Sequence, residues 1–240
     1  MRATDLLPSN LGDRRTWPRL ASSLVGYGAL ALLVLLGWFF INRDALKYLT
    51  WSPDVYQRFW PQRWLLVPHV VTAGAALLLG ALQFIKPIRQ RWPRFHRTIG
   101  WLYVVAGLVG APLAFRLSMF SSCLMCIPPF ALWSVMWFIA TLLAIVMAVR
   151  RDFEAHRQFM LRSYVLMNGF VFVRLDTHLP YPLPEGPGVD RPAMIIWVAW
   201  VVPLLVTELW LSWRPLALGR RRQKVARDRQ EGTVAAEGTP

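Results

Sequence analysis

Six apolar stretches, each of about twenty residues, divide this chain and constrain its fold more than any other feature. An α-helix of that length and polarity is what the hydrocarbon core of a bilayer requires. Lipid cannot hydrogen-bond the backbone, and the alternation of barrel strands is absent, so each stretch is predicted to be a helix. We therefore predict an all-α integral membrane protein, a six-transmembrane-helix bundle over residues 20–213. Its predicted spans are residues 20–41, 64–85, 98–115, 130–149, 156–175 and 192–213.

The charged residues lie between these stretches, and their distribution predicts how the chain is oriented. Arginines are dense in four segments and scarce in two: dense in 1–19, 86–97, 150–157 and 214–240, scarce in 116–129 and 176–191. The positive-inside rule assigns the arginine-rich side to the cytoplasm. Both termini are therefore expected in the cytoplasm, as a basic N-terminus and a basic, disordered tail. The aromatic loop between the first two spans has mixed charge and is expected to lie along the membrane surface.

The net charge of +14 raises the question of a nucleic-acid partner. The arginines fall in short loops beside apolar segments, where membrane topology alone accounts for them. We therefore expect the lipid bilayer and its anionic headgroups as partners, and no nucleic acid. Arginine far outnumbers lysine, as in GC-rich bacterial genomes, so the membrane expected is the bacterial inner membrane.

Two histidine–arginine pairs are the first candidates for chemistry. His96-Arg97 and His156-Arg157 each open a predicted helix on the cytoplasmic side. The partial positive charge of a helix N-terminus disfavours a charged imidazole, so both rings are expected to be neutral. A neutral ring has one nitrogen that can accept a hydrogen bond or bind a metal. Because each pair opens a helix on the same side of the membrane, the two pairs are predicted to lie at a similar depth on two different helices.

Several interpretations of these histidines stay open. They could hold a small ligand, a lipid headgroup or another anion, together with the arginines. They could instead be the axial ligands of one b-type haem, or part of a quinone site. Zinc needs three or four ligands, and two are evident, so no metal site is predicted. They could also be interfacial residues without a ligand. His69 and His178, toward the opposite side, are further ligand candidates.

Four polar residues inside the predicted spans form a second group. Arg162 and Glu208 each lie one to one and a half turns from the cytoplasmic end of their helices. A charge at that depth is costly unless it is paired or hydrated, so we predict an Arg162–Glu208 ion pair, with Gln83 as a third member. Asn168, near the middle of its span, is expected to face the bundle and to bond a neighbouring helix.

The chain has two cysteines, Cys123 and Cys126, on the predicted outer side. A Cys-x-x-Cys pair there can form a disulfide and can shuttle electrons. Without a thioredoxin-like pattern the pair favours a static disulfide, or two apolar thiols, over redox catalysis.

Two segments resemble a known family. Residues 69–103 read HVVTAGAALLLGALQFIKPIRQRWPRFHRTIGWLY, and residues 156–175 read HRQFMLRSYVLMNGFVFVRL. Together they resemble the predicted bacterial membrane proteins catalogued as domain of unknown function twenty-three-oh-six. The matching positions are His69; Gly80, Gln83 and Phe84; His96, Arg97, Gly100 and Tyr103; and His156, Arg157, Met160, Arg162, Ser163 and Tyr164. The resemblance covers the second to fifth predicted spans and implies a topology but no activity.

The sequence therefore predicts a polytopic membrane protein that binds a small ligand, lipid or anion at a cytoplasm-facing His/Arg site between the third and fifth spans. Two alternatives are a haem- or quinone-linked redox protein that uses His96 and His156, and an outer-face thiol oxidoreductase that uses Cys123 and Cys126. No phosphate-binding glycine loop, Ser-His-Asp order or zinc-protease motif is present. The sequence therefore assigns no catalytic residues.

Overall fold

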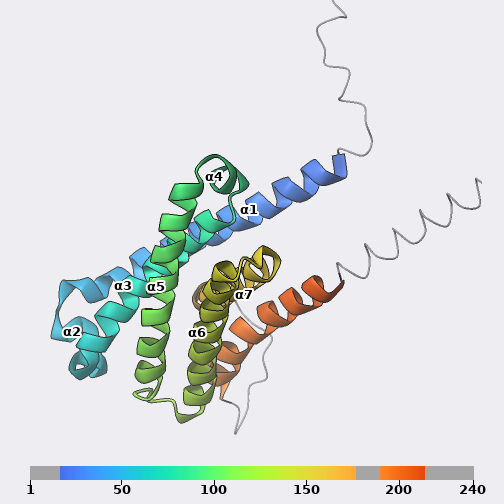
Figure 1. Ribbon diagram of the computed structural model, residues 1–240. Coiled ribbons are helices and arrows are strands. Elements are labelled where there is room, and N and C mark those ends of the chain that lie inside the picture. The colour runs from blue at the N-terminus through green and yellow to red at the C-terminus, as the bar shows by residue number, and fades with distance from the viewer. Residues whose placement is uncertain (1–16, 177–189, 214–240) are drawn as a thin grey trace, which may run out of the picture.

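The structure is a computed structural model that describes residues 17–176 and 190–213, and these are helical, without a strand. Figure 1 shows the helices in chain order. They are α1 (Trp17–Phe40), η1 (Ile41–Ala45), η2 (Leu46–Thr50), α2 (Pro53–Tyr56), η3 (Gln57–Gln62), α3 (Arg63–Gln83), α4 (Lys86–Arg91), α5 (Pro93–Ser118), η4 (Leu124–Cys126), α6 (Ile127–Val149) and α7 (Phe153–Asp176). A C-terminal helix, Arg191–Trp213, follows.

The long helices run between two ends of one bundle (Figure 1). We call one the α4 end, where α3 and α6 end and α5 and α7 begin, and the other the η4 end, where the α5–α6 loop lies. Helix α3 packs on α5, α5 on α6, and α6 on α7, while α7 also contacts α1 and α3. The contacts therefore form a closed ring of four helices, in which α5 and α7 run in the same direction.

Five helical stretches within the described residues are long and apolar enough to cross a membrane, and α7 is not one of them. The position of α7 in the bundle explains why it is less apolar than the other long helices. No side chain between Met160 and Val171 is exposed, because α1, α3 and α6 all contact this helix. A helix surrounded by other helices does not need an apolar surface. Helix α7 nevertheless packs along α6, from the His156 contact with the Ala144 carbonyl to the Leu166 carbonyl, which accepts from the Trp133 indole N–H.

The surface of the bundle is apolar where it would meet lipid. Large side chains on α1 and on the C-terminal helix are widely exposed, for example Leu24 at 71% and Leu209 at 62%. A water-soluble protein rarely exposes so continuous an apolar surface. These helices therefore present the surface that a bilayer, rather than water, would cover.

Several helices start earlier than the sequence predicts, and at α5 and α7 the reason is local. Helix α5 begins at Pro93 instead of residue 98, because proline suits the first turn, where its missing N–H costs nothing. Helix α7 begins at Phe153 instead of His156. The Asp152 carboxylate accepts a hydrogen bond from the Ala155 N–H at 3.0 Å, which caps the first turn. Each histidine is therefore the fourth residue of its helix.

Candidate functional site

A chain of buried hydroxyls fixes the register between α5, α6 and α7. The Tyr103 hydroxyl lies 2.6 Å from the Ser163 Oγ, and the Ser163 Oγ lies 2.7 Å from the Thr141 Oγ1. All three side chains are fully buried. The Thr141 hydroxyl also donates to the Trp137 carbonyl at 2.8 Å. Because α5 and α7 are parallel, this contact determines which other residues of the two helices lie at the same level.

His96 and His156 each lie seven residues before a member of this chain, Tyr103 on α5 and Ser163 on α7. Seven residues are about two turns, so each histidine lies on nearly the same helix face as the hydroxyl. The two imidazoles are close enough for His156, and also Arg89, to influence His96 electrostatically. The structure therefore brings the two predicted histidines to the same level at the α4 end of the bundle.

Within the part of the chain that the structure describes, each imidazole has a nitrogen without a hydrogen bond. The His156 Nδ1 lies 2.7 Å from the Ala144 carbonyl of α6. A carbonyl can only accept, so Nδ1 carries the proton, and Nε2 of the neutral ring has a lone pair. The His96 Nδ1 is buried and has no hydrogen-bond partner among the described residues. The site can therefore accept a hydrogen bond or bind a metal through either ring.

The arginines that follow these histidines point elsewhere. The Arg157 guanidinium pairs with Glu154 one turn earlier, and its side chain is 59% exposed. Arg97 is also exposed, and its Nε lies 3.4 Å from the Pro93 carbonyl of its own helix. Both guanidiniums therefore contribute positive charge around the histidines rather than direct contacts in the described structure.

Arg162 and Glu208 form a bidentate ion pair between α7 and the C-terminal helix. The Arg162 Nε donates to the Glu208 Oε1 at 2.5 Å, and its second nitrogen donates to Oε2 at 2.8 Å. Gln83 is 7% exposed and packs against Gly100 of α5. Its Nε2 has no partner in the described part of the chain, so it does not donate to Glu208.

Asn168 is buried in the middle of α7, with 1% of its surface exposed. From the sequence we expected it to bond a neighbouring helix. Its Nδ2 instead donates to the Tyr164 carbonyl of its own helix at 2.8 Å. An amide one turn after a helix carbonyl can reach that carbonyl without any neighbour, which explains the difference.

His69 belongs to the η4 end. His69, in the second turn of α3, lies with its Nδ1 3.0 Å from the Gly110 carbonyl of α5. As with His156, the carbonyl can only accept, so Nδ1 carries the proton and Nε2 has the lone pair. His178 lies outside the described residues. The structure therefore separates His69 from the pair at the α4 end.

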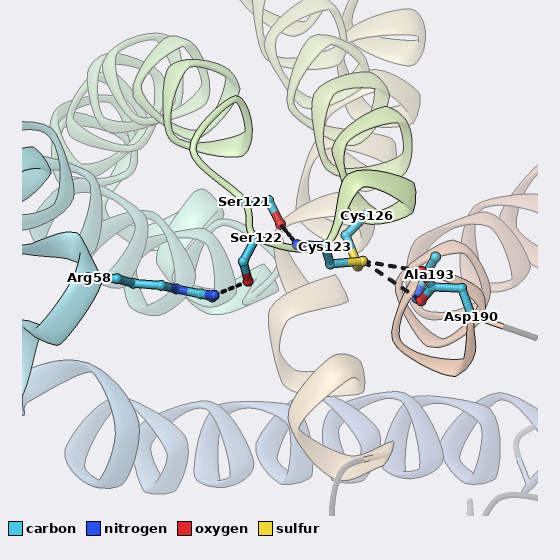
Figure 2. Close-up of a disulfide and its surroundings, with 7 residues drawn as sticks. All are labelled: Arg58, Ser121, Ser122, Cys123, Cys126, Asp190 and Ala193. Carbon is cyan, nitrogen blue, oxygen red and sulfur yellow. Dashed lines mark hydrogen bonds between the residues drawn. A yellow bond between two sulfur atoms is a disulfide. The ribbon is translucent and has the colours of Figure 1, made fainter.

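Cys123 and Cys126 are joined by a disulfide in the α5–α6 loop (Figure 2). The Asp190 carboxylate, at the start of the C-terminal helix, lies 3.5 Å from the Cys123 sulfur. The same carboxylate caps that helix, accepting from the Ala193 N–H at 3.1 Å. Arg58 donates to Ser122 on the opposite side of the loop (Figure 2). A disulfide sulfur carries no proton, so only the reduced Cys123 thiol would donate to Asp190.

The sequence alone assigns no role to Tyr103, Ser163, Thr141 or Asp190. A signal for two of them was present: Tyr103 and Ser163 are 60 residues apart, and so are His96 and His156. When two helices are parallel, pairs of residues with the same sequence separation lie opposite each other at successive levels, so a contact in one pair aligns the other. Nothing comparable in the sequence relates Asp190 to the cysteines.

Comparison with known proteins supports a membrane location. The family model described as "Predicted membrane protein (DUF2306)" matches residues 66–211. No curated protein and no solved structure shows significant similarity to the chain. The match covers α3 to the C-terminal helix, which includes both histidine–arginine pairs and the Arg162–Glu208 pair. The chain therefore belongs to the DUF2306 family of multi-pass predicted membrane proteins.

Proposed function

We propose that the chain crosses the bacterial inner membrane six times, with both termini in the cytoplasm. Two observations support this topology. Helices α1, α3, α5, α6, α7 and the C-terminal helix alternate in direction between the two ends of the bundle (Figure 1). The α4 end carries a dense group of basic residues, namely Lys86, Arg89, Arg91, Arg94, Arg97, Arg150 and Arg151. The positive-inside rule assigns such an end to the cytoplasm.

Tag mapping tests this topology. A reporter that is active only in the cytoplasm should be active at either terminus and in the α6–α7 turn, and inactive after Ser121. The reason is that six spans return the chain to the side on which it began. A five-span protein, with α7 not crossing, would place the α6–α7 turn and the C-terminus on different sides, contrary to the proposal.

We further propose that the His96–His156 site binds the phosphate-bearing headgroup of an anionic lipid. The observation that carries this proposal is the common register of the two histidines on parallel helices. The N-termini of α5 and α7 both lie there, and a helix N-terminus attracts a phosphate. The surrounding arginines add positive charge. The imidazole nitrogens that have no partner among residues 17–176 and 190–213 can accept hydrogen bonds from headgroup hydroxyls or amines. The site lies at the end of the bundle, which is the level of lipid headgroups rather than of acyl chains.

A b-type haem is the alternative, and one observation favours it. The His156 Nδ1–H is held by a carbonyl, and metal-binding histidines characteristically donate their second N–H to such a group. Two histidines on parallel helices that lie diagonally across the four-helix ring could then provide both axial ligands, with the haem iron supplying electron transfer. The lipid proposal and this alternative use the same rings, so one set of variants distinguishes them.

The test is purification in mild detergent, followed by native mass spectrometry and an absorbance spectrum. Wild type should retain an anionic phospholipid, and the His96→Ala/His156→Ala variant should retain at least tenfold less. Gln90→Ala, an exposed change at the same end, should retain as much as wild type. A Soret band that the double variant lacks would replace the lipid proposal with the haem alternative. Equal lipid in all three proteins, without a Soret band, would refute both.

A further inference from the structure

A cavity of about 440 Å³ lies between α3, α5, α6 and α7, toward the η4 end. Arg58 and Phe59 of η3 lie at its edge, and Leu77 and Trp137 lie deepest toward the α4 end. Ligand pockets in proteins usually have volumes of roughly 300–1,000 Å³. The cavity is therefore large enough for a small molecule, and it is separate from the His96–His156 site.

The walls of the cavity are mostly apolar, with aromatic side chains among the aliphatic ones. Five rings line it: Phe59, Phe130, Trp133, Trp137 and Phe170. Ala73, Gly74 and Ala114 line it too, and their small side chains leave the space open. A Cβ added to Gly74 would meet only one atom, Ile41 Cδ1 at 3.9 Å, so the space beside Gly74 is empty. Aromatic walls favour a planar ring, which can stack on them or meet their edges.

The polar side chains at the cavity are a histidine, two arginines and three serines, Ser118, Ser121 and Ser134. The hydroxyls of Ser118 and Ser134 already donate to carbonyls of their own helices. His69 lines it, and its Nδ1–H is held by the Gly110 carbonyl, so its Nε2 can accept a hydrogen bond. Arg58 and Arg174 also line it, and no carboxylate does so within the described structure. The Arg174 Nε lies 3.9 Å from the Asp44 carboxylate, which neutralises part of its charge. A ligand with oxygen acceptors, and with a hydroxyl in its reduced form, matches these groups.

We propose that this cavity binds a lipid-soluble ring compound of the quinone class. The aromatic side chains would hold the ring, an arginine would donate to a quinone oxygen, and the His69 Nε2 would accept from a quinol hydroxyl. A simple fatty acid uses the aromatic walls poorly and has no proton to donate to His69 when ionised. The site is independent of the headgroup site, because it lies at the other end of the bundle.

The test uses the full-length protein in detergent and decylubiquinone as the probe. Its binding should quench tryptophan fluorescence, because Trp133 and Trp137 line the cavity. Gly74→Leu, which fills the empty space, should weaken binding at least tenfold. Gly28→Leu, at a position with nothing within 4 Å, should leave binding unchanged. His69→Ala should weaken decylubiquinol more than decylubiquinone, because only the quinol donates to Nε2.

Three results would overturn the proposal: no saturable quenching, equal affinity in wild type and Gly74→Leu, or displacement of the quinone by an equal concentration of lauric acid. The last would identify a carboxylate-binding cavity instead. The His96→Ala/His156→Ala variant should bind decylubiquinone as wild type does. That comparison keeps a failure of the cavity proposal distinct from a failure of the headgroup proposal.

Discussion

Replacing Glu208 by leucine is expected to lower the free energy of unfolding by about 3 kcal/mol, because it leaves the Arg162 guanidinium unpaired within the helical bundle. Only 21% of the Arg162 side chain is exposed, so water cannot fully replace the lost carboxylate. The Arg162 guanidinium also lies over the Phe159 ring, but this cation–π contact is weaker than a bidentate ion pair. The measurement is thermal unfolding in detergent, followed by size-exclusion chromatography of the protein that remains folded.

The matched control is Arg162→Leu/Glu208→Leu, which removes both charges. It should be clearly more stable than Glu208→Leu alone, since no unpaired charge is left and the leucines suit an apolar helix surface. A double variant that is as unstable as the sum of the two single variants would show that the charges are not coupled. The pair would then have no energetic role in holding the C-terminal helix to α7.

The same substitution at two glycines of α3 is expected to have opposite outcomes. Gly80→Leu should cost about 3 kcal/mol or more, because the added Cβ alone would lie 2.5 Å from Tyr164 and 2.8 Å from Tyr103 ring carbons. Both tyrosines are buried and hydrogen-bonded, so neither ring can move away cheaply. Gly74→Leu should be tolerated, since the added side chain enters the cavity.

Unfolding of the two variants in one detergent checks this expectation. Gly74→Leu should keep the wild-type midpoint or exceed it, because leucine also has a better helix propensity than glycine by roughly 1 kcal/mol. Equal losses at both positions would mean that the space beside Gly74 is filled in solution. That result would also remove the structural basis for the quinone cavity.

Much of the fold follows from local sequence, and the exceptions have identifiable causes. Hydrophobic length is sufficient to predict helices, because lipid leaves a spanning segment little alternative. The start of α7 differs because Asp152 caps the helix three residues earlier than the apolar pattern begins. Composition also cannot tell whether a polar helix such as α7 is surrounded by lipid or by other helices, so its crossing stays a prediction.

The candidate sites were predictable to different degrees. Charge and depth were sufficient to suggest partners for Arg162 and Glu208, because an unpaired charge in a span is costly. The roles of Arg97 and Arg157 were harder to predict, since a flexible side chain chooses among nearby acceptors that only coordinates reveal. The contact between Asp190 and Cys123 joins residues 67 apart in the chain, and no local pattern relates them.

The sequence by itself determined that this is a multi-pass helical membrane protein of the DUF2306 family, because length, apolarity and motif spacing are local properties of the chain. It also placed a histidine–arginine pair near the start of each of two helices. The sequence also predicted a similar depth for these two pairs, and the tertiary structure set the alignment of the two histidines, since it depends on the buried Tyr103–Ser163 contact between α5 and α7. The cavity beside His69 likewise exists only through packing, because its walls come from four helices whose relative rotation no single segment specifies.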